Sequence, residues 1–228
     1  MRKDFSRQRQ AAVDALKAEG ILRSPSVIRA MLTVPREEFL PNDVKHYAYA
    51  DTPLPIGYGQ TTSALHMTAI FCEYGELKIG QKVLEVGAGC GYMSCVYAEV
   101  VAPSDLPREK WGHVWTVEIV EELAEAAREN LVKAGYSDRV TAVHGDGSIG
   151  LKENSPYDII IVTSAAPDVP EDLVEQLNPN GILLIPVGGI HFYQELLRIR
   201  RHQDGTTSRQ SLGGVAFVPM RGKAGWKS

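Results

Sequence analysis

Residues 82–92 read KVLEVGAGCGY, and this stretch decides the fold. A short β-rich run ends at three glycines, Gly87, Gly89 and Gly91, and the following run over residues 92–101 predicts a helix. Glycine has no Cβ, so a strand-to-helix turn built from it can be sharp and can bring the backbone close to a ligand. The spacing is G-x-G-x-G rather than the G-x-G-x-x-G of the dinucleotide-binding fingerprint, which makes a dinucleotide enzyme the weaker interpretation. A tight turn that binds no ligand is the alternative.

Short β-rich runs alternate with helical stretches from residue 82 onward. This alternation is typical of βαβ units, in which helices cover both faces of a parallel sheet. The runs DIIIV at 158–162 and ILLIPV at 182–187 do not alternate with polar residues, as expected of central strands buried on both sides. The sequence therefore predicts an α/β, Rossmann-like fold with a mostly parallel, doubly wound sheet. The predicted strands are Lys82–Val86, His113–Glu118, Arg139–His144, Tyr157–Thr163 and Gly181–Val187.

The sheet is predicted to end in an antiparallel edge pair. Two longer strand-like runs, Tyr193–Arg201 and Ser211–Pro219, are separated by the polar turn Gln203–Ser208. A helix is predicted over residues 120–134, where apolar residues recur at helical spacing and Gly135 follows as a C-cap.

The region before residue 82 has a different character. Two predicted helices, near residues 4–19 and 26–32, are followed by the proline- and glycine-rich stretch PREEFLPNDVKHYAYADTPLPIGYGQTTS at 35–63. A long irregular segment inside a compact domain is usually functional or a linker. Since this one runs directly into a further helical stretch, a functional role is favoured.

The composition is that of a folded chain of ordinary size, with 228 residues, 44% hydrophobic and 23% charged. We expect one domain over residues 1–228, in which residues 1–62 form a helical and loop extension that contributes to the substrate site and residues 63–228 form the core. The net charge of −4 gives no global reason to bind nucleic acid. No run approaches the roughly 20 apolar residues that cross a bilayer, so no membrane partner is expected. The polar start of the chain lacks a signal-peptide core, which predicts a cytoplasmic protein.

The three cysteines, Cys72, Cys90 and Cys95, predict neither a disulfide framework nor a metal site. Their number is odd, and no histidine stands at zinc-finger spacing, so a reducing compartment fits. Cys90 lies inside the glycine loop, but no neighbouring base or resolving cysteine is evident, and a packing role is expected.

Polar residues follow successive predicted strands at the sheet edge where ligands bind in open α/β folds. The second strand ends in Glu118, whose carboxylate can accept both hydroxyls of a ribose. The third leads into Asp146 and Gly147, which could accept from an adenine amino group and allow close backbone approach. Each also has a plainer interpretation, Glu118 as a solvated acid at a helix start and Asp146 as a turn former. Convergence of all of them at one edge favours a ligand site.

Glu85, in the strand before the glycine loop, indicates the charge of that ligand. A carboxylate suits a cationic ligand, such as a sulfonium that carries an ammonium group, better than a pyrophosphate. This argument favours S-adenosylmethionine over NAD as the cofactor. Glu85 could equally hydrogen-bond the loop backbone.

The chain resembles the protein-L-isoaspartate (D-aspartate) O-methyltransferase family over most of its length. The segment IGYGQTTS at 56–63 is the specific part, whereas glycine loops and GDG occur in many methyltransferases. The resemblance implies a class I methyltransferase fold with S-adenosyl-L-methionine as cofactor, S-adenosyl-L-homocysteine as product and no metal. It implies methyl transfer to the α-carboxyl of L-isoaspartyl residues in damaged proteins and peptides, a repair reaction. The similar segments are PREEFLP, YADTPLPIGYGQTTSALHM, VLEVGAGCGY, GDGSIGL, PYDIIIVTSAAPDVPEDLVEQL, NGILLIPVG and FVPM.

The resemblance also implies which residues act on the substrate: Ser63 is the one regarded as catalytic, with Thr61, Thr62 and His66 lining the site. A substrate carboxylate with a pKa near about 4 is already ionised at neutral pH, so Ser63 is expected to orient it by a hydrogen bond, not to attack. Ser63 could equally be a helix N-cap, and the two roles are compatible. A lone histidine such as His66 is more often a structural hydrogen-bonder. Leu65 stands where the family often has Pro.

Two other functions stay open on the residues alone. A class I methyltransferase that acts on a small molecule or RNA would share the cofactor loop but would not need GQTTS. A non-catalytic module could keep the fold and bind the cofactor without transfer.

Overall fold

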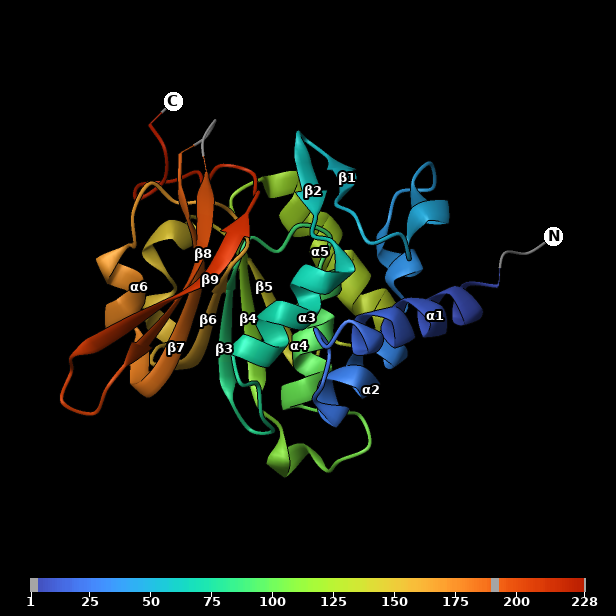
Figure 1. Cartoon of the computed structure of the whole chain (residues 1–228), viewed down its shortest axis with the longest axis horizontal. Coiled ribbons are helices and arrows are strands. Elements are labelled where there is room, and N and C mark those ends of the chain that lie inside the picture. Colours follow the sequence, from blue (N-terminus) through green and yellow to red (C-terminus); the bar gives the residue numbers. More distant parts are fainter. Residues whose placement is uncertain (1–3, 190–192, 228) are drawn as a thin grey trace.

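The computed structural model describes residues 4–189 and 193–227, with a seven-stranded sheet at its centre (Figure 1). The strands lie in the order β5-β4-β3-β6-β7-β8-β9. The first five are parallel and the last two antiparallel, which confirms the mostly parallel sheet with an antiparallel edge pair. The strands are β3 (Lys82–Val86), β4 (His113–Glu118), β5 (Val140–His144), β6 (Tyr157–Val162), β7 (Leu177–Gly188), β8 (Gln194–Arg201) and β9 (Thr207–Val215).

Strand β3 lies where the chain changes direction across the sheet. β4 and β5 extend the sheet on one side of β3, and β6 and β7 extend it on the other. In open α/β sheets, ligands bind in the crevice beyond the carboxyl end of such a strand. The glycine loop that follows β3 therefore lies at the switch point of the sheet.

Helices cover the two faces of the sheet unequally. Along β6, Ile159 and Ile161 face one hydrophobic core, whereas Ile160 and Val162 face the other. The run DIIIV lacks polar alternation because both faces of this strand are buried. The helices of the first face are α3 (Leu65–Tyr74), α4 (Tyr92–Val101) and α5 (Glu121–Ala134), and the short α6 (Glu171–Glu175) lies on the second.

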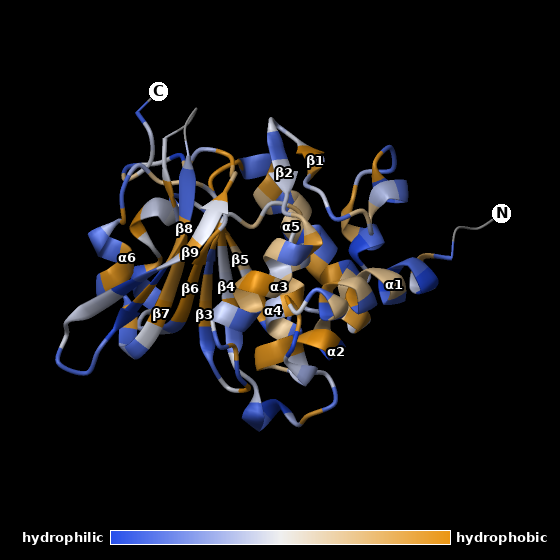
Figure 2. Cartoon of the chain, in the orientation of Figure 1, coloured by the Kyte–Doolittle hydropathy of each residue, from blue (hydrophilic) through white to orange (hydrophobic). Residues whose placement is uncertain are grey.

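The N-terminal helices pack on the outside of α4. α1 (Phe5–Ala18) lies against α2 (Pro25–Thr33), and α2 lies against α4, so both predicted N-terminal helices are confirmed. Every residue of α4 is buried as a result, and Figure 2 shows apolar ribbon gathered where α2, α3 and α4 meet. None of the helices in the described part of the chain combines the length and the apolarity of a membrane span.

The structure differs from the sequence-based prediction at three places, of which one is the start of β7, at Leu177 rather than at Gly181. The outer edge strand runs over Thr207–Val215, so it begins within the predicted turn and ends before Pro219. Its residues are mostly exposed and show no apolar alternation, whereas its backbone pairing with β8 continues up to the turn. The stretch read as irregular contains an antiparallel hairpin of β1 (Leu54–Gly57) and β2 (Gln60–Thr62).

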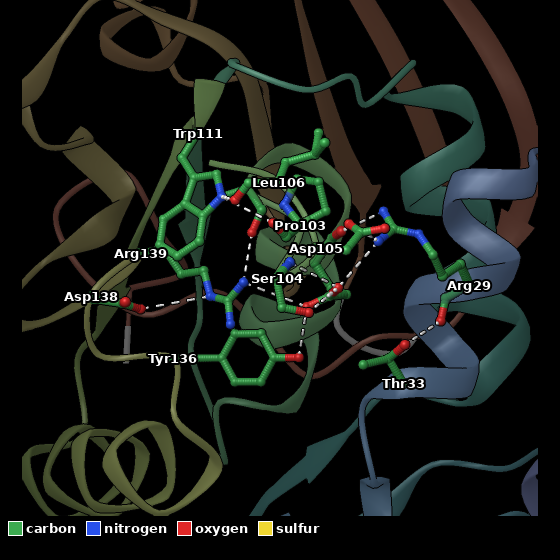
Figure 3. A network of polar contacts seen from close by, with 12 residues as sticks. Arg29, Thr33, Pro103, Ser104, Asp105, Leu106, Trp111, Tyr136, Asp138 and Arg139 are labelled. Carbon is green, nitrogen blue, oxygen red and sulfur yellow. Dashed lines mark hydrogen bonds and ion pairs between the residues drawn. The ribbon is translucent and has the colours of Figure 1, made fainter. Parts of the chain in front are cut away.

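Residues 103–112, which we call the insertion, are held by a polar network (Figure 3). Because they lead into the start of β4, they lie at the opposite end of the parallel strands from the glycine loop. Trp111 Nε1 donates to two carbonyl oxygens of the segment at 2.9 Å, and the Arg139 guanidinium lies 4.8 Å from the centre of the Trp111 ring. Beneath them, the buried Glu99 accepts from the Tyr136 hydroxyl at 3.0 Å and lies 3.6 Å from an Arg139 nitrogen. The segment is thus structural and lies far from the switch point.

Candidate active site

The glycine loop forms the sharp turn that its sequence predicts. Gly87, Gly89 and Gly91 all have positive φ, at +102°, +54° and +83°. A Cβ on Gly87 would lie 2.2 Å from the hydroxyl oxygen of Thr163, which itself donates to the carbonyl oxygens of residues 86 and 87. A side chain is therefore excluded at position 87, and the backbone of the turn borders an open cleft at the carboxyl end of β3.

Glu118 lies in this cleft and faces the glycine loop. Its Oε2 accepts the Gly89 N–H at 2.9 Å, and its Oε1 accepts the Val120 N–H at 3.1 Å. The residue is only 6% exposed, which argues against a freely solvated acid at the start of α5. A carboxylate has about four acceptor positions, so Glu118 can still accept from a ligand.

Gly147 and Asp146 differ in their placement. Gly147 lines the cleft, and a Cβ there would lie 2.8 Å from a methyl carbon of Val86. Asp146 does not line the cleft, because its carboxylate accepts from the N–H and hydroxyl of Ser148 and from the N–H of Lys223. Its contacts are those of a turn former that also holds the C-terminal segment against the sheet.

Glu85 is fully buried beneath the loop and does not line the cleft. Ser94 and Thr116 donate to one of its carboxylate oxygens, the latter at 2.7 Å. The other oxygen has no hydrogen-bond partner among the described residues. Burial raises the pKa of Glu85 to about 7, although the two hydroxyl donors oppose this shift.

A larger cavity, which we call the groove, adjoins the cleft. Its volume is about 740 Å³, and it lies between the turn after α1, helix α3 and the edge strands. Thr61, Thr163 and Val218 line both the groove and the cleft, so the two spaces meet at these residues. Much of the remaining lining is apolar, including Ile21, Met67, Ile70, Tyr74, Leu196, Leu212, Val215 and Phe217.

Three of the four predicted substrate residues line the groove. These are Ser63, Thr61 and His66, whereas Thr62 is buried and lines neither space. The N-cap interpretation of Ser63 is wrong, because α3 begins at Leu65 and Ala64 occupies the N-cap position. The Ser63 hydroxyl makes no hydrogen bond to another described residue and faces the groove without a competing partner.

Two residues of the site escaped the sequence analysis. Asp51 Oδ1 accepts the His66 backbone N–H at 2.9 Å, and both Asp51 oxygens lie 3.0 Å from His66 Nδ1. No periodicity or motif connects these residues, which are 15 positions apart. Thr163, the second residue, directly follows β6 and could have been found by the same strand-end argument that indicated Glu118.

Most of the chain matches one family of known proteins. The sequence profile of the protein-L-isoaspartate(D-aspartate) O-methyltransferase (PCMT) family matches residues 7–225. The protein-L-isoaspartate O-methyltransferase of Hyperthermus butylicus is 54% identical over 223 residues, which are 98% of this chain and 92% of the relative. That of Methanothermobacter thermautotrophicus is 50% identical over 220 residues, with 96% and 98% covered.

Two solved structures are similar over nearly the whole chain. One, described as a protein-L-isoaspartate O-methyltransferase, superposes with a TM-score of 0.84 at 31% identity and covers 95% of this chain and 67% of its own. The other is a candidate protein-L-isoaspartate O-methyltransferase of Plasmodium falciparum in complex with S-adenosyl-L-homocysteine. Its TM-score is 0.80 at 27% identity, with 93% of this chain and 98% of that chain covered.

Proposed function

The chain belongs to the protein-L-isoaspartate(D-aspartate) O-methyltransferase family, and from this we propose that its cleft holds S-adenosylmethionine while its groove holds an isoaspartyl peptide. The reaction is a repair step: a methyl group passes from the cofactor to the α-carboxyl of an L-isoaspartyl residue. One observation carries the assignment of the two spaces. They meet at Thr61 and Thr163, so a cofactor in one and a peptide carboxylate in the other can come into contact.

The cleft residues fit this cofactor. A Cβ at Gly87 or Gly147 would collide with neighbouring protein atoms, so the backbone itself borders the cleft at both positions, and Glu118 retains acceptor positions for the ribose hydroxyls. Bound S-adenosylmethionine supplies an electrophilic methyl group. Glu85 and Asp146 support the cleft from behind its lining, where Glu85 fixes the strands under the loop and Asp146 fixes the C-terminal segment.

Ser63 orients the methyl acceptor. The α-carboxylate of the substrate is ionised at neutral pH and requires no general base. Within residues 4–189 and 193–227 the Ser63 hydroxyl has no hydrogen-bond partner, and it lines the groove, where it can donate to that carboxylate. Holding the two reactants in line can lower the barrier by about 7–11 kcal/mol in favourable intramolecular models. Among the described residues the Ser63 hydroxyl makes no hydrogen bond to His66, whose Nδ1 lies against Asp51, so no Ser–His pair is formed that would activate Ser63 as a nucleophile.

The N-terminal extension completes the groove. Ile21 and Arg23 come from the turn after α1, Pro53 directly precedes β1, and Thr61 lies in β2. The extension, residues 1–62, thus supplies one wall of the groove and, through Ile56, Gln60 and Thr61, part of the cleft; the other cleft residues belong to the core, residues 63–228. We place the enzyme in the cytoplasm, where a reducing environment suits three buried free thiols.

The test is methyl transfer from labelled S-adenosylmethionine to one peptide sequence made in isoaspartyl and normal aspartyl forms. We expect transfer to the isoaspartyl form alone. Ser63→Ala should lower kcat about 10- to 100-fold, the worth of one hydrogen bond to a charged group, whereas the exposed Ser208→Ala should leave it unchanged. Cofactor binding without transfer to either peptide would instead indicate a non-catalytic module.

A further inference from the structure

A single carboxylate, that of Asp51, holds both the backbone and the side chain of His66. It accepts the N–H of the first turn of α3 at 2.9 Å and lies 3.0 Å from the imidazole Nδ1. Asp51 lies in the irregular segment before β1, whereas His66 is the second residue of α3. The contact therefore connects the N-terminal extension to the helix that follows Ser63.

This contact determines which nitrogen of His66 carries a proton. An ionised carboxylate can only accept, so the proton on the engaged side is on Nδ1. In the neutral imidazole, Nε2 then has a free lone pair. His66 lines the groove together with Ser63, and Nε2 is the nitrogen left for a ligand there.

A buried cation, Arg36, comes from the same irregular segment as Asp51. Arg36 is fully buried, its guanidinium packs 5.3 Å from the centre of the Tyr92 ring, and none of its three side-chain nitrogens has a hydrogen-bond partner among the described residues. Burial lowers the pKa of Arg36, and the negative charge of Asp51 is among the influences that oppose this shift. Arg36 forms no ion pair with Asp51 among the described residues, so the placement of His66 rests on the Asp51 contacts themselves.

We propose that Asp51 is a substrate-positioning residue, which holds His66 so that Nε2 accepts a backbone N–H of the bound isoaspartyl peptide. This proposal rests on the proposed function of the groove. An acceptor at Nε2 attracts a peptide N–H and repels a carboxylate oxygen. The substrate carboxylate is thereby left to the Ser63 hydroxyl, and the peptide is fixed in one orientation.

Asp51→Asn separates positioning from helix capping. Asparagine keeps an oxygen that can accept the His66 N–H, but its NH₂ group donates to Nδ1 and moves the ring proton to Nε2, so the acceptor in the groove is lost. We expect KM for an isoaspartyl peptide to rise about tenfold, with kcat within about twofold, an unchanged Kd for S-adenosylmethionine and an unchanged Tm. Asp43→Asn, on an exposed aspartate of the same segment, is the matched control and should behave as wild type. A lowered Tm with unchanged KM would reduce Asp51 to a helix cap and overturn the proposal.

A second measurement needs no change at Asp51. Isoaspartyl peptides in which one backbone amide at a time is replaced by an ester lose a single N–H. One position near the isoaspartyl residue should raise KM of the wild-type enzyme about tenfold and have almost no effect on His66→Ala. Equal sensitivity of both enzymes at every position would overturn the proposal. Failure of the proposed function would look different, because wild-type enzyme would then not discriminate isoaspartyl from aspartyl peptides.

Discussion

At the scale of single residues, Glu118 and Asp51 each accept a backbone N–H of the site, and Glu118 could be predicted from the sequence, whereas Asp51 could not. Glu118 faces a ligand space and fixes the glycine loop, and the position of such an acid at a strand end could be predicted from the sequence. Asp51 could not be predicted, because its partner becomes its neighbour only when the irregular segment folds back onto α3. A capping carboxylate supplied from 15 residues away leaves no local signal. The same contact frees Ser63 from the capping role that its position suggested.

Leu65 shows how a departure from a family pattern can be neutral. It occupies the first position of α3, where proline is also well tolerated because that N–H has no partner within the helix. The side chain of Leu65 is buried in the core. The start of the helix therefore needs no proline here.

Gly87→Ala should destabilise the protein and weaken cofactor binding together. Alanine at φ +102° is strained, and its Cβ would collide with the Thr163 hydroxyl oxygen, so we expect a loss of about 2–4 kcal/mol in the free energy of unfolding. Gly205→Ala is the matched control, with φ +83° but no atom within 4 Å of the added Cβ. It should cost about 1 kcal/mol and leave cofactor affinity unchanged. Chemical denaturation measures the free energy of unfolding, and calorimetric titration with S-adenosylmethionine measures the cofactor affinity. Equal losses of unfolding free energy in the two variants would contradict the steric argument.

Glu85 should make stability depend on pH. Its carboxyl titrates near 4.5 in the unfolded chain and at about 7 in the folded protein, chiefly because of burial. Between these two pKa values the folded protein binds more protons than the unfolded chain. The contribution of Glu85 to the free energy of unfolding is therefore fully present below pH 4.5 and is lost as the pH rises towards 7. The loss amounts to about 3 kcal/mol at most.

The measurement is guanidinium denaturation of wild type and Glu85→Gln from pH 5 to pH 8. Glutamine has no titrating proton. The unfolding free energy of wild type should therefore fall relative to that of Glu85→Gln as the pH rises towards 7, and the difference should then level off. Parallel curves would mean that Glu85 is already ionised when buried.

At the scale of elements, the sequence predicted the buried parts well and the exposed parts poorly. β6 and α4 are predicted to within one residue because burial on both faces removes all polar alternation from the strand and makes the helix apolar throughout. The hairpin β1–β2 and the start of β9 depend on backbone pairing between exposed residues. Such pairing has no side-chain pattern, so these segments could not be distinguished from turns.

Glu99 joins elements that the sheet alone does not connect. It lies in α4 and contacts Arg29 of α2, Ser104 of the insertion and Tyr136 after α5. Removing one partner from a buried ionic network leaves the other charges uncompensated.

We therefore expect Glu99→Ala to lower the free energy of unfolding by about 3–5 kcal/mol, with KM for peptide and cofactor unchanged in the protein that remains folded. Glu129→Ala breaks an exposed pair with Lys133 on α5 and serves as the control. Its effect should stay below about 0.5 kcal/mol. Thermal or denaturant unfolding of both variants tests the difference, and a small effect of Glu99→Ala would show that the network is dispensable.

At the scale of the whole molecule, chemistry and structural support lie at opposite ends of the parallel strands. The glycine loop, Glu118 and Gly147 meet at the carboxyl ends, as the strand-end rule predicts. The insertion and the Glu99 network lie at the amino ends. The groove could not be predicted in the same way, because its walls come from the N-terminal extension, α3 and the edge strands, which are far apart in sequence.

The shape of the groove affects which isoaspartyl sites are methylated fastest. If the groove holds the substrate as proposed, an isoaspartyl residue enters a recess lined by residues of α3, the hairpin and the edge strands, and we expect a flexible segment to enter it more readily than a rigid surface. Lesions at frayed termini and loop tips can enter directly, whereas a lesion in a packed element must wait for its host to open locally. The host's own opening free energy then enters the overall rate. We therefore expect isoaspartyl sites in the most flexible segments of a damaged protein to be methylated, and so repaired, before those in packed elements.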